Sequence, residues 1–313
     1  MGEEATTVKR RRWLHRDSNP ILIKELRGRM RGARAFIVLT VYLLLLSCFV
    51  SAIYYAYSAG ASGPSGGLEM AYLGKVVFAS VVLIEIFMVT FITPAFTAGA
   101  ISGERERKTY ELLRTTLLPA RKLVFGKLTS ALTYMLLLIL AVVPLESMAF
   151  VLGGVVVEEL GLALVILLVT TFFFAAVGLF FSSLVRTTLV STVLTYATAL
   201  LLTVGLPVLL LIFATALIDP LIYGYGSTTP SWVMQAVLMY LGVFLASLSP
   251  ISTAVLTEIF LEENAVLYLW QDLDSTHRVP IPSAWIVYTV IHLSLALVLL
   301  VVATLLVRRQ ERR

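Results

Sequence analysis

Charged residues and cysteine are both scarce in this sequence. Only 14% of the 313 residues are charged and 59% are hydrophobic, whereas a soluble domain averages about 25% charged and roughly 45–50% apolar residues. The single cysteine, Cys48, lies inside an apolar run, which excludes a disulfide framework and a thiolate metal cluster. This composition excludes an ordinary soluble protein.

Motifs for nucleotide binding and catalysis are also missing. The phosphate-loop pattern G-x-x-x-x-G-K-[ST] does not occur, because neither Gly74-Lys75 nor Gly126-Lys127 is followed by serine or threonine. The three histidines are scattered, and none belongs to the zinc-protease pattern H-E-x-x-H. The sequence therefore predicts no catalytic residues, no metal site and no cofactor bound by this chain itself.

What the sequence has instead is long apolar runs. A membrane-spanning helix needs about 20 consecutive, mostly apolar residues. The sequence therefore predicts an all-α integral membrane protein, with a single transmembrane domain over residues 35–307 and no soluble domain of any size. The six predicted transmembrane helices cover residues 35–57, 72–98, 128–150, 160–182, 188–216 and 284–307.

The N-terminal segment, residues 1–34, carries ten basic side chains. We attribute them to cytoplasmic retention and to binding of anionic lipid headgroups. Nucleic acid is not an expected partner, because no base-reading motif accompanies the basic residues. Asn19-Pro20 is a typical helix start, and an apolar stripe opposed by basic residues follows it. Pro20–Arg34 is therefore predicted to be an amphipathic helix on the cytoplasmic face of the membrane.

The distribution of positive charge decides the predicted topology. Six spans with both termini in the cytoplasm place 22 of the 24 Lys and Arg residues inside, as the positive-inside rule requires, and make residues 308–313 a basic cytoplasmic tail. If the apolar stretch Trp232–Leu248 were a seventh crossing, this tail would lie outside. We therefore predict that residues 232–257 form a re-entrant hairpin, broken at Pro250, that dips into the outer leaflet and packs against the bundle.

Polar residues within the spans are candidates for the substrate pathway. Glu85 lies in the middle of the second span, where a charge costs about 2.5–3.5 kcal/mol on insertion. It either lines a pathway or accepts a proton, or it is simply neutral, or hydrogen-bonded to a serine or threonine of a neighbouring helix. Glu146 lies nearer the end of a span, where a structural or interfacial role is expected. Small hydroxylated residues in the second and fifth spans either allow close helix packing, the more common explanation, or line the pathway or a dimer seam. The candidates for pathway or seam are Glu85, Thr93, Thr97, Thr192 and Thr195.

The densest run of mixed charge is Ser102–Arg114, between the second and third spans. Its serine suits a helix cap and its first glutamates suit the positive end of a helix dipole. Glu104 and Lys108 stand four residues apart, in the order that stabilises a helix. The apolar residues of the run lie at its far end, as expected of a helix that docks into a groove: Tyr110, Leu112 and Leu113. A plain charged loop is the alternative.

Two segments of the chain resemble a known family. Pro94–Thr116 and Asn19–Arg27 resemble the permease subunits of ABC transporters of the type-2 exporter class. In that family the N-terminal segment is a connecting helix at the inner surface, and the helix after the second span is the coupling helix that docks on the ATPase. The resemblance implies that the ATPase-docking residues of this chain are Glu104, Arg105, Glu106, Arg107, Lys108, Thr109, Tyr110, Glu111, Leu112 and Leu113.

The resemblance also implies partners, a location and a mechanism. The chain would be the membrane-spanning permease subunit of an ATP-driven exporter, surrounded by lipid in the plasma (inner) membrane of a prokaryote. It would pair with a second permease, identical or related, and with a separate ABC ATPase subunit that binds ATP and Mg²⁺ and drives alternating access. The sequence does not indicate a substrate. The main alternative is an ion-coupled secondary transporter or channel that uses Glu85; a scaffold or an enzyme is disfavoured by the missing catalytic residues.

Overall fold

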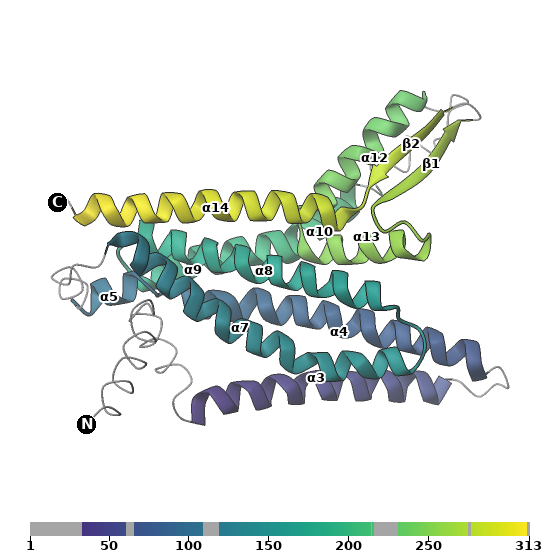
Figure 1. The fold of residues 1–313 in the computed structure, drawn as a ribbon, viewed down its shortest axis with the longest axis horizontal. Coiled ribbons are helices and arrows are strands. Elements are labelled where there is room, and N and C mark those ends of the chain that lie inside the picture. Colours follow the sequence, from purple (N-terminus) through teal and green to yellow (C-terminus); the bar gives the residue numbers. More distant parts are fainter. Residues whose placement is uncertain are drawn as a thin grey trace, which may run out of the picture.

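The computed structural model describes residues 33–60, 66–108, 119–213, 215, 231–274 and 277–311, and the protein is mostly helical (Figure 1). Six helices in these ranges are long and apolar enough to cross a membrane. They are α3 (Ala33–Gly60), α4 (Gly66–Thr97), α7 (Ala120–Val151), α8 (Val157–Leu184), a composite of α9 (Thr188–Leu200), η1 (Leu201–Gly205) and α10 (Leu206–Phe213), and α14 (Ala284–Glu311). Each overlaps one of the six predicted spans, so the prediction of six membrane-spanning helices is confirmed. The predicted amphipathic helix Pro20–Arg34 lies almost wholly outside the described residues.

Several helices are longer than the apolar runs that predicted them. Helix α7 follows Pro119 and begins at Ala120, well before the predicted start at Leu128. Its first turn contains the exposed residues Arg121 and Lys122. Arginine and lysine are good helix formers, so they end the apolar run without ending the helix.

Helix α8 lies at the centre of the bundle and packs against α4, α7, α9 and α14 (Figure 1). Its buried face includes Phe173, Phe174 and several small residues. At one of these, Gly178, an added Cβ would lie 2.9 Å from the Cβ of Thr97 on α4. Small residues let membrane helices approach closely and so gain van der Waals contact. Glycine at this position therefore brings α8 and the end of α4 together.

The fifth span is not a uniform α-helix. Its middle segment, η1, is a π-helix, and Pro207 follows at the second position of α10. A proline ring clashes with the carbonyl group four residues earlier, which here belongs to Thr203 of the π-helix. In a π-helix each carbonyl group accepts a hydrogen bond from the residue five positions later instead of four. In this turn the carbonyl group of Thr203 therefore does not need an N–H group from Pro207.

Two of the six spans are mostly exposed when the chain is considered alone. Over the most apolar 18 residues of each, only 11% are buried in α3 and 11% in the fifth span, against 61% in α8. Their exposed side chains are large and apolar, for example Phe36 and Leu44 on α3 and Leu189 and Leu211 on the fifth span. In a membrane these faces contact lipid or another protein.

The stretch predicted to be re-entrant forms two helices, α12 (Trp232–Ala246) and α13 (Pro250–Glu262). They are separated by three residues, 247–249, and Pro250 is the first residue of α13, so the predicted break falls where the structure has one. The 15-residue α12 is shorter than the helices that could cross a membrane. The depth of this pair in the bilayer stays a prediction.

A β-hairpin follows α13, so the description of the chain as all-α is wrong in this one element. Strands β1 (Tyr268–Asp274) and β2 (His277–Pro282) pair antiparallel, from Tyr268 opposite Pro282 to Asp274 opposite His277. Ile281 is buried with Val243 of α12 and Phe260 of α13. Figure 1 shows the hairpin and α12 projecting together from the end of the bundle opposite α5 (Ser102–Glu106).

Candidate functional site

The charged segment begins at a tight turn at the end of α4. The N–H groups of Ile101 and Ser102 donate to Oγ of Ser182 on α8, at 2.9 and 3.0 Å. Ser191 of α9 donates from Oγ to the carbonyl oxygen of Ala98, at 2.6 Å. The serine of the segment was expected to cap its own helix, and this is wrong: the hydroxyl of Ser102 lies 3.2 Å from that of Ser182, which is the capping group. The start of α5 is therefore held by α8 and α9.

Arg105 and Glu106 hold the turn between α8 and α9. The Arg105 guanidinium donates to the carbonyl oxygens of Ser183, at 3.1 Å, and Val185, at 3.2 Å, at the C-terminal end of α8. The Glu106 carboxylate accepts hydrogen bonds from the N–H of Thr188, at 2.8 Å, and from its Oγ1, at 2.7 Å, at the first residue of α9. Helix C-termini carry partial negative charge and N-termini partial positive charge. Two consecutive residues of opposite charge thus match two consecutive helix ends; we call this pair the Arg105–Glu106 clasp.

Glu104 links α5 to a third helix. Its Oε1 lies 2.7 Å from Nζ of Lys127 on α7, whose side chain is only 4% exposed. A buried ammonium group requires an anionic partner, because leaving water costs several kcal/mol per ion (about 3 or more). Through Glu104 and the clasp, α5 is therefore bound to α7, α8 and α9.

The docking segment predicted over Glu104–Leu113 is only partly covered. Helix α5 ends at Glu106, and Lys108 has φ of 57°, the left-handed conformation, so the helix does not run unbroken through Lys108 as the spacing of its charges predicted. Arg107 and Lys108 are exposed. The remaining predicted docking residues lie outside the described part of the chain: Thr109, Tyr110, Glu111, Leu112 and Leu113.

The pathway candidate Glu85 is fully buried in α4. The Tyr42 hydroxyl of α3 donates to its Oε1 at 3.3 Å, and the carboxyl group of Glu146, also buried, lies beside it from α7. The sequence indicated separate roles for Glu85 and Glu146, and the structure brings them together. Within the described ranges, no group of three or more His, Cys, Asp or Glu residues is placed to hold a metal ion.

The threonine candidates are packed inside this chain. Thr93, Thr97 and Thr195 are fully buried, and Thr192 is half-buried. The hydroxyls of Thr97, Thr192 and Thr195 donate to carbonyl oxygens four residues earlier in the chain, at 3.2, 2.8 and 2.7 Å. This placement favours close packing of α4 and α9. A role in the pathway or in a dimer seam stays a prediction.

The sequence did not identify the residues that receive the charged segment, namely Lys127, Ser182, Ser183 and Thr188. One signal was available. The predicted cytoplasmic loops 99–127 and 183–187 lie on the same face, and the second is too short to fold on its own. The polar residues of the loop 183–187 could therefore be expected to bind either to the loop 99–127 or to water.

Comparison with known proteins gives one family. Residues 19–312 match the family model described as ABC-2 family transporter protein, which is nearly the whole chain. Comparison with curated proteins gives no match. The match agrees with the six membrane-spanning helices and with the resemblance of the segment after the second span. This chain belongs to the ABC-2 family of transporter proteins and is a multi-pass membrane permease.

Proposed function

We propose that this chain is the membrane-spanning subunit of an ATP-driven exporter, and that a separate ATPase subunit docks on the segment Glu104–Leu113. The observation that carries the proposal is the attachment of α5 to three spanning helices through Glu104, Arg105 and Glu106. These three side chains are engaged within the chain. The contact with the ATPase then falls on Arg107, Lys108 and the apolar residues that follow them.

The attachment gives a displacement of α5 a direct route into the bundle. A push on α5 acts on the end of α8 through Arg105, on the start of α9 through Glu106, and on α7 through Glu104. Hydrogen bonds in which one partner is charged are shorter and stronger than those between neutral groups. Because α8 also packs against α4 and α14, its movement reaches most of the bundle, as a rigid-body rocking mechanism requires.

The proposal includes a second permease and a membrane orientation. The exposed apolar faces of α3 and the fifth span provide surfaces for lipid and for the second permease, identical or related, with the pathway between the two. Both termini and α5 would lie in the cytoplasm, in the plasma (inner) membrane of a prokaryote. ATP and Mg²⁺ would bind to the ATPase partner.

A pull-down from native membranes in mild detergent tests the docking. We expect the tagged chain to co-purify with an ABC ATPase, and Leu112→Asp to abolish the association. Glu158→Gln, an exposed carboxylate at the opposite end of the bundle, is the matched control and retains it. A chain that purifies without any ATPase, or an association unchanged by Leu112→Asp, contradicts the proposal.

Cysteine labelling tests the orientation. Because Cys48 is the single cysteine, Cys48→Ser provides a background for introduced cysteines. We expect Arg107→Cys to react with a membrane-impermeant maleimide only after the membrane is opened, and Tyr268→Cys in the exposed part of β1 to react in intact cells. Labelling of position 107 in intact cells would place α5 outside and end the docking proposal.

One observation supports the alternative of ion coupling. Glu85, Glu146 and the hydroxyl of Tyr42 meet in the interior of the bundle, where carboxyl groups are costly and commonly functional. Proteoliposomes that contain the chain alone, under a proton or sodium gradient, test this. Transport without ATPase that is lost in Glu85→Gln favours ion coupling, whereas the absence of transport until the ATPase subunit and ATP are added rejects it.

A further inference from the structure

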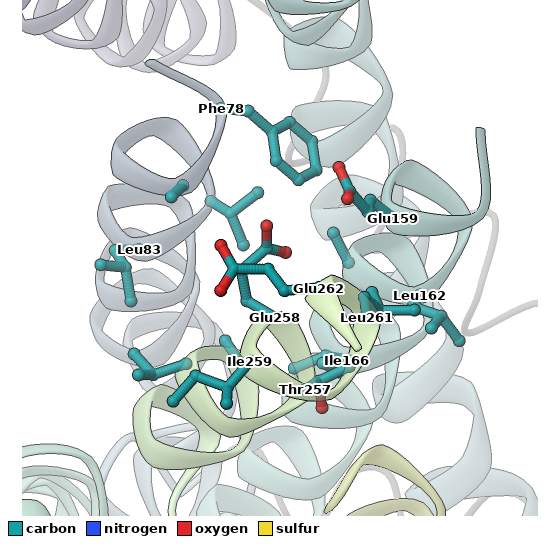
Figure 2. Close-up of a pocket in the computed structure, with 15 residues that line it drawn as sticks. Phe78, Leu83, Glu159, Leu162, Ile166, Thr257, Glu258, Ile259, Leu261 and Glu262 are labelled. Atoms are coloured by element: carbon teal, nitrogen blue, oxygen red, sulfur yellow. The ribbon is translucent and has the colours of Figure 1, made fainter. Parts of the chain in front are cut away.

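A cavity of about 190 Å³ lies between α4, α8 and α13, at the end of the bundle opposite α5 (Figures 1 and 2). Most of its lining is apolar and includes Phe78 and Val82 of α4 with Leu162 and Ile166 of α8. Apolar cavities with a few convergent polar groups are typical ligand sites. The polar groups here are unusual because most of them are acidic.

Three carboxyl groups converge on this apolar lining. Figure 2 shows those of Glu258 and Glu262, from α13, in the middle of the cavity, with Glu159 of α8 on its other side. Glu159 is 5% exposed. Thr257 is also part of the lining, and its buried hydroxyl has no hydrogen-bond partner among the described residues. The cavity therefore offers several oxygen acceptors within apolar walls.

One basic side chain meets these acids. Nζ of Lys75 lies 3.1 Å from Oε1 of Glu258 and 3.0 Å from Oε1 of Glu262, and it interacts electrostatically with Glu159. Three carboxyl groups face one ammonium group, which leaves an excess of negative charge beside the apolar lining. Glu262 is 55% exposed and so keeps contact with solvent, whereas the side chain of Glu258 is 23% exposed and Glu159 is 5% exposed. Negative charge on the deeper carboxyl groups is costly unless protons or cations neutralise it.

We propose that this cavity binds an amphiphilic organic cation, with its ammonium head at Glu258 and Glu262 and its apolar tail along α4 and α8. Phe78 is an aromatic residue of the lining, and aromatic rings attract cations through cation–π contacts. Val255 and Ile259 of α13 are part of the lining and are also exposed on the outside of the bundle, so the apolar wall continues onto the surface that meets lipid. The tail therefore reaches the cavity sideways from the membrane. The same charges exclude an anionic amphiphile.

This inference goes beyond ATP-driven export, since binding to the cavity requires neither an ATPase nor transport. On the predicted topology the cavity lies in the outer half of the membrane. Lys75 competes with the ligand, because its ammonium group contacts the same two carboxylates, Glu258 and Glu262, that would bind the head of the ligand. Removal of Lys75 and removal of its acidic partners should therefore change ligand binding in opposite directions.

Photolabelling of the full chain in phosphatidylcholine nanodiscs tests the proposal. The probe is decyltrimethylammonium with a diazirine on its chain, and the matched anion is the corresponding decyl sulfonate. We expect saturable labelling of peptides from α4, α8 and α13 by the cation and not by the sulfonate. In the double variant Glu258→Gln, Glu262→Gln the concentration for half-maximal labelling should rise about tenfold, which corresponds to roughly 1.4 kcal/mol.

Two further variants separate ligand binding from general damage to the fold. Glu263→Gln, an exposed neighbour that is not part of the lining, should leave labelling unchanged. Lys75→Met should strengthen labelling by the cation, which a destabilised protein would not do. Equal labelling by the sulfonate, unchanged labelling of the double variant, or weaker labelling of Lys75→Met would each overturn the proposal.

Discussion

Gly178→Ala should push α8 away from the end of α4, next to the start of α5. An added methyl group would lie 2.9 Å from the Cβ of Thr97 and 3.2 Å from the backbone N of Ala98, and it would overlap Oγ1 of Thr97. Real Cβ contacts are essentially never closer than 3.0 Å. The helices must therefore separate or a backbone must shift.

The size of the effect follows from two opposing contributions. Overpacking of a close contact costs about 1–3 kcal/mol, whereas replacing glycine by alanine within a helix stabilises it by roughly 0.5–1 kcal/mol. Gly161 lies in the same helix and is a matched control, because its added Cβ would have no atom within 4 Å. The helix contribution cancels in the comparison, so Gly178→Ala should be less stable than Gly161→Ala by about 1–3 kcal/mol.

Equilibrium unfolding of the purified chain in mixed micelles measures this difference. Adding Thr97→Ala to Gly178→Ala should recover part of the loss, because it removes the overlapping hydroxyl and leaves the close Cβ. Thr97→Ala alone should cost little, because that hydroxyl bonds within its own helix, to the carbonyl oxygen of Thr93 at 3.2 Å. Equal stability of Gly178→Ala and Gly161→Ala would refute the close contact between α4 and α8.

Three further outcomes are expected. Arg105→Met should leave the ATPase bound in a pull-down but lower transport per ATP hydrolysed, because α5 loses its hold on the end of α8; unchanged coupling would refute this transmission role. Glu104→Gln and Lys127→Met should each lower stability, and the double variant should lose less stability than the sum of the two single losses, because removing both groups leaves no buried charge unpaired. Additive losses in a double-mutant cycle would show that the 2.7 Å pair is not coupled. Tyr240→Phe should cost about 1 kcal/mol and speed amide exchange in β2, because the hydrogen bond to the carbonyl oxygen of Pro280, at 2.6 Å, is lost; unchanged exchange would contradict this contact.

The sequence predicted the helical bundle well because a membrane span is a local property. About 20 apolar residues suffice to identify one, and no knowledge of its neighbours is needed. The ends of spans are different, as the first turn of α7 shows, because a charged helix former such as Arg121 leaves the hydrocarbon without leaving the helix. The β-hairpin was missed because the loop before α14 was interpreted by its acidic charge. Leu269 and Ile281 face each other across the two strands and pack in the same apolar cluster. Their neighbours along the chain are aromatic residues or prolines, so no alternation of apolar and polar residues marks either strand.

Contacts between distant segments could not be predicted in the same way. The sequence of the run Ser102–Arg114 does not show that Arg105 and Glu106 contact the end of α8 and the start of α9. These contacts depend on how α4 and α8 cross. Likewise, Glu85 and Glu146 belong to different spans and meet only through the packing of α4 against α7. Sequence pattern identified the polar residues, and the fold supplied their partners.

The π-helical turn at Leu201–Gly205 makes the fifth span, in effect, an α-helix with one residue inserted. Each residue advances an α-helix by about 100°, but the wider π-helical turn absorbs the extra residue locally. Excising a single residue from this turn would therefore restore a regular helix and leave the side chains of Leu206–Phe213 facing nearly the same way. If the turn instead became α-helical with all its residues retained, the side chains of α10 would rotate by up to roughly 100°. The outward-facing leucines of α10 would then face a different neighbour, while α9 and its contact with Glu106 stayed in place.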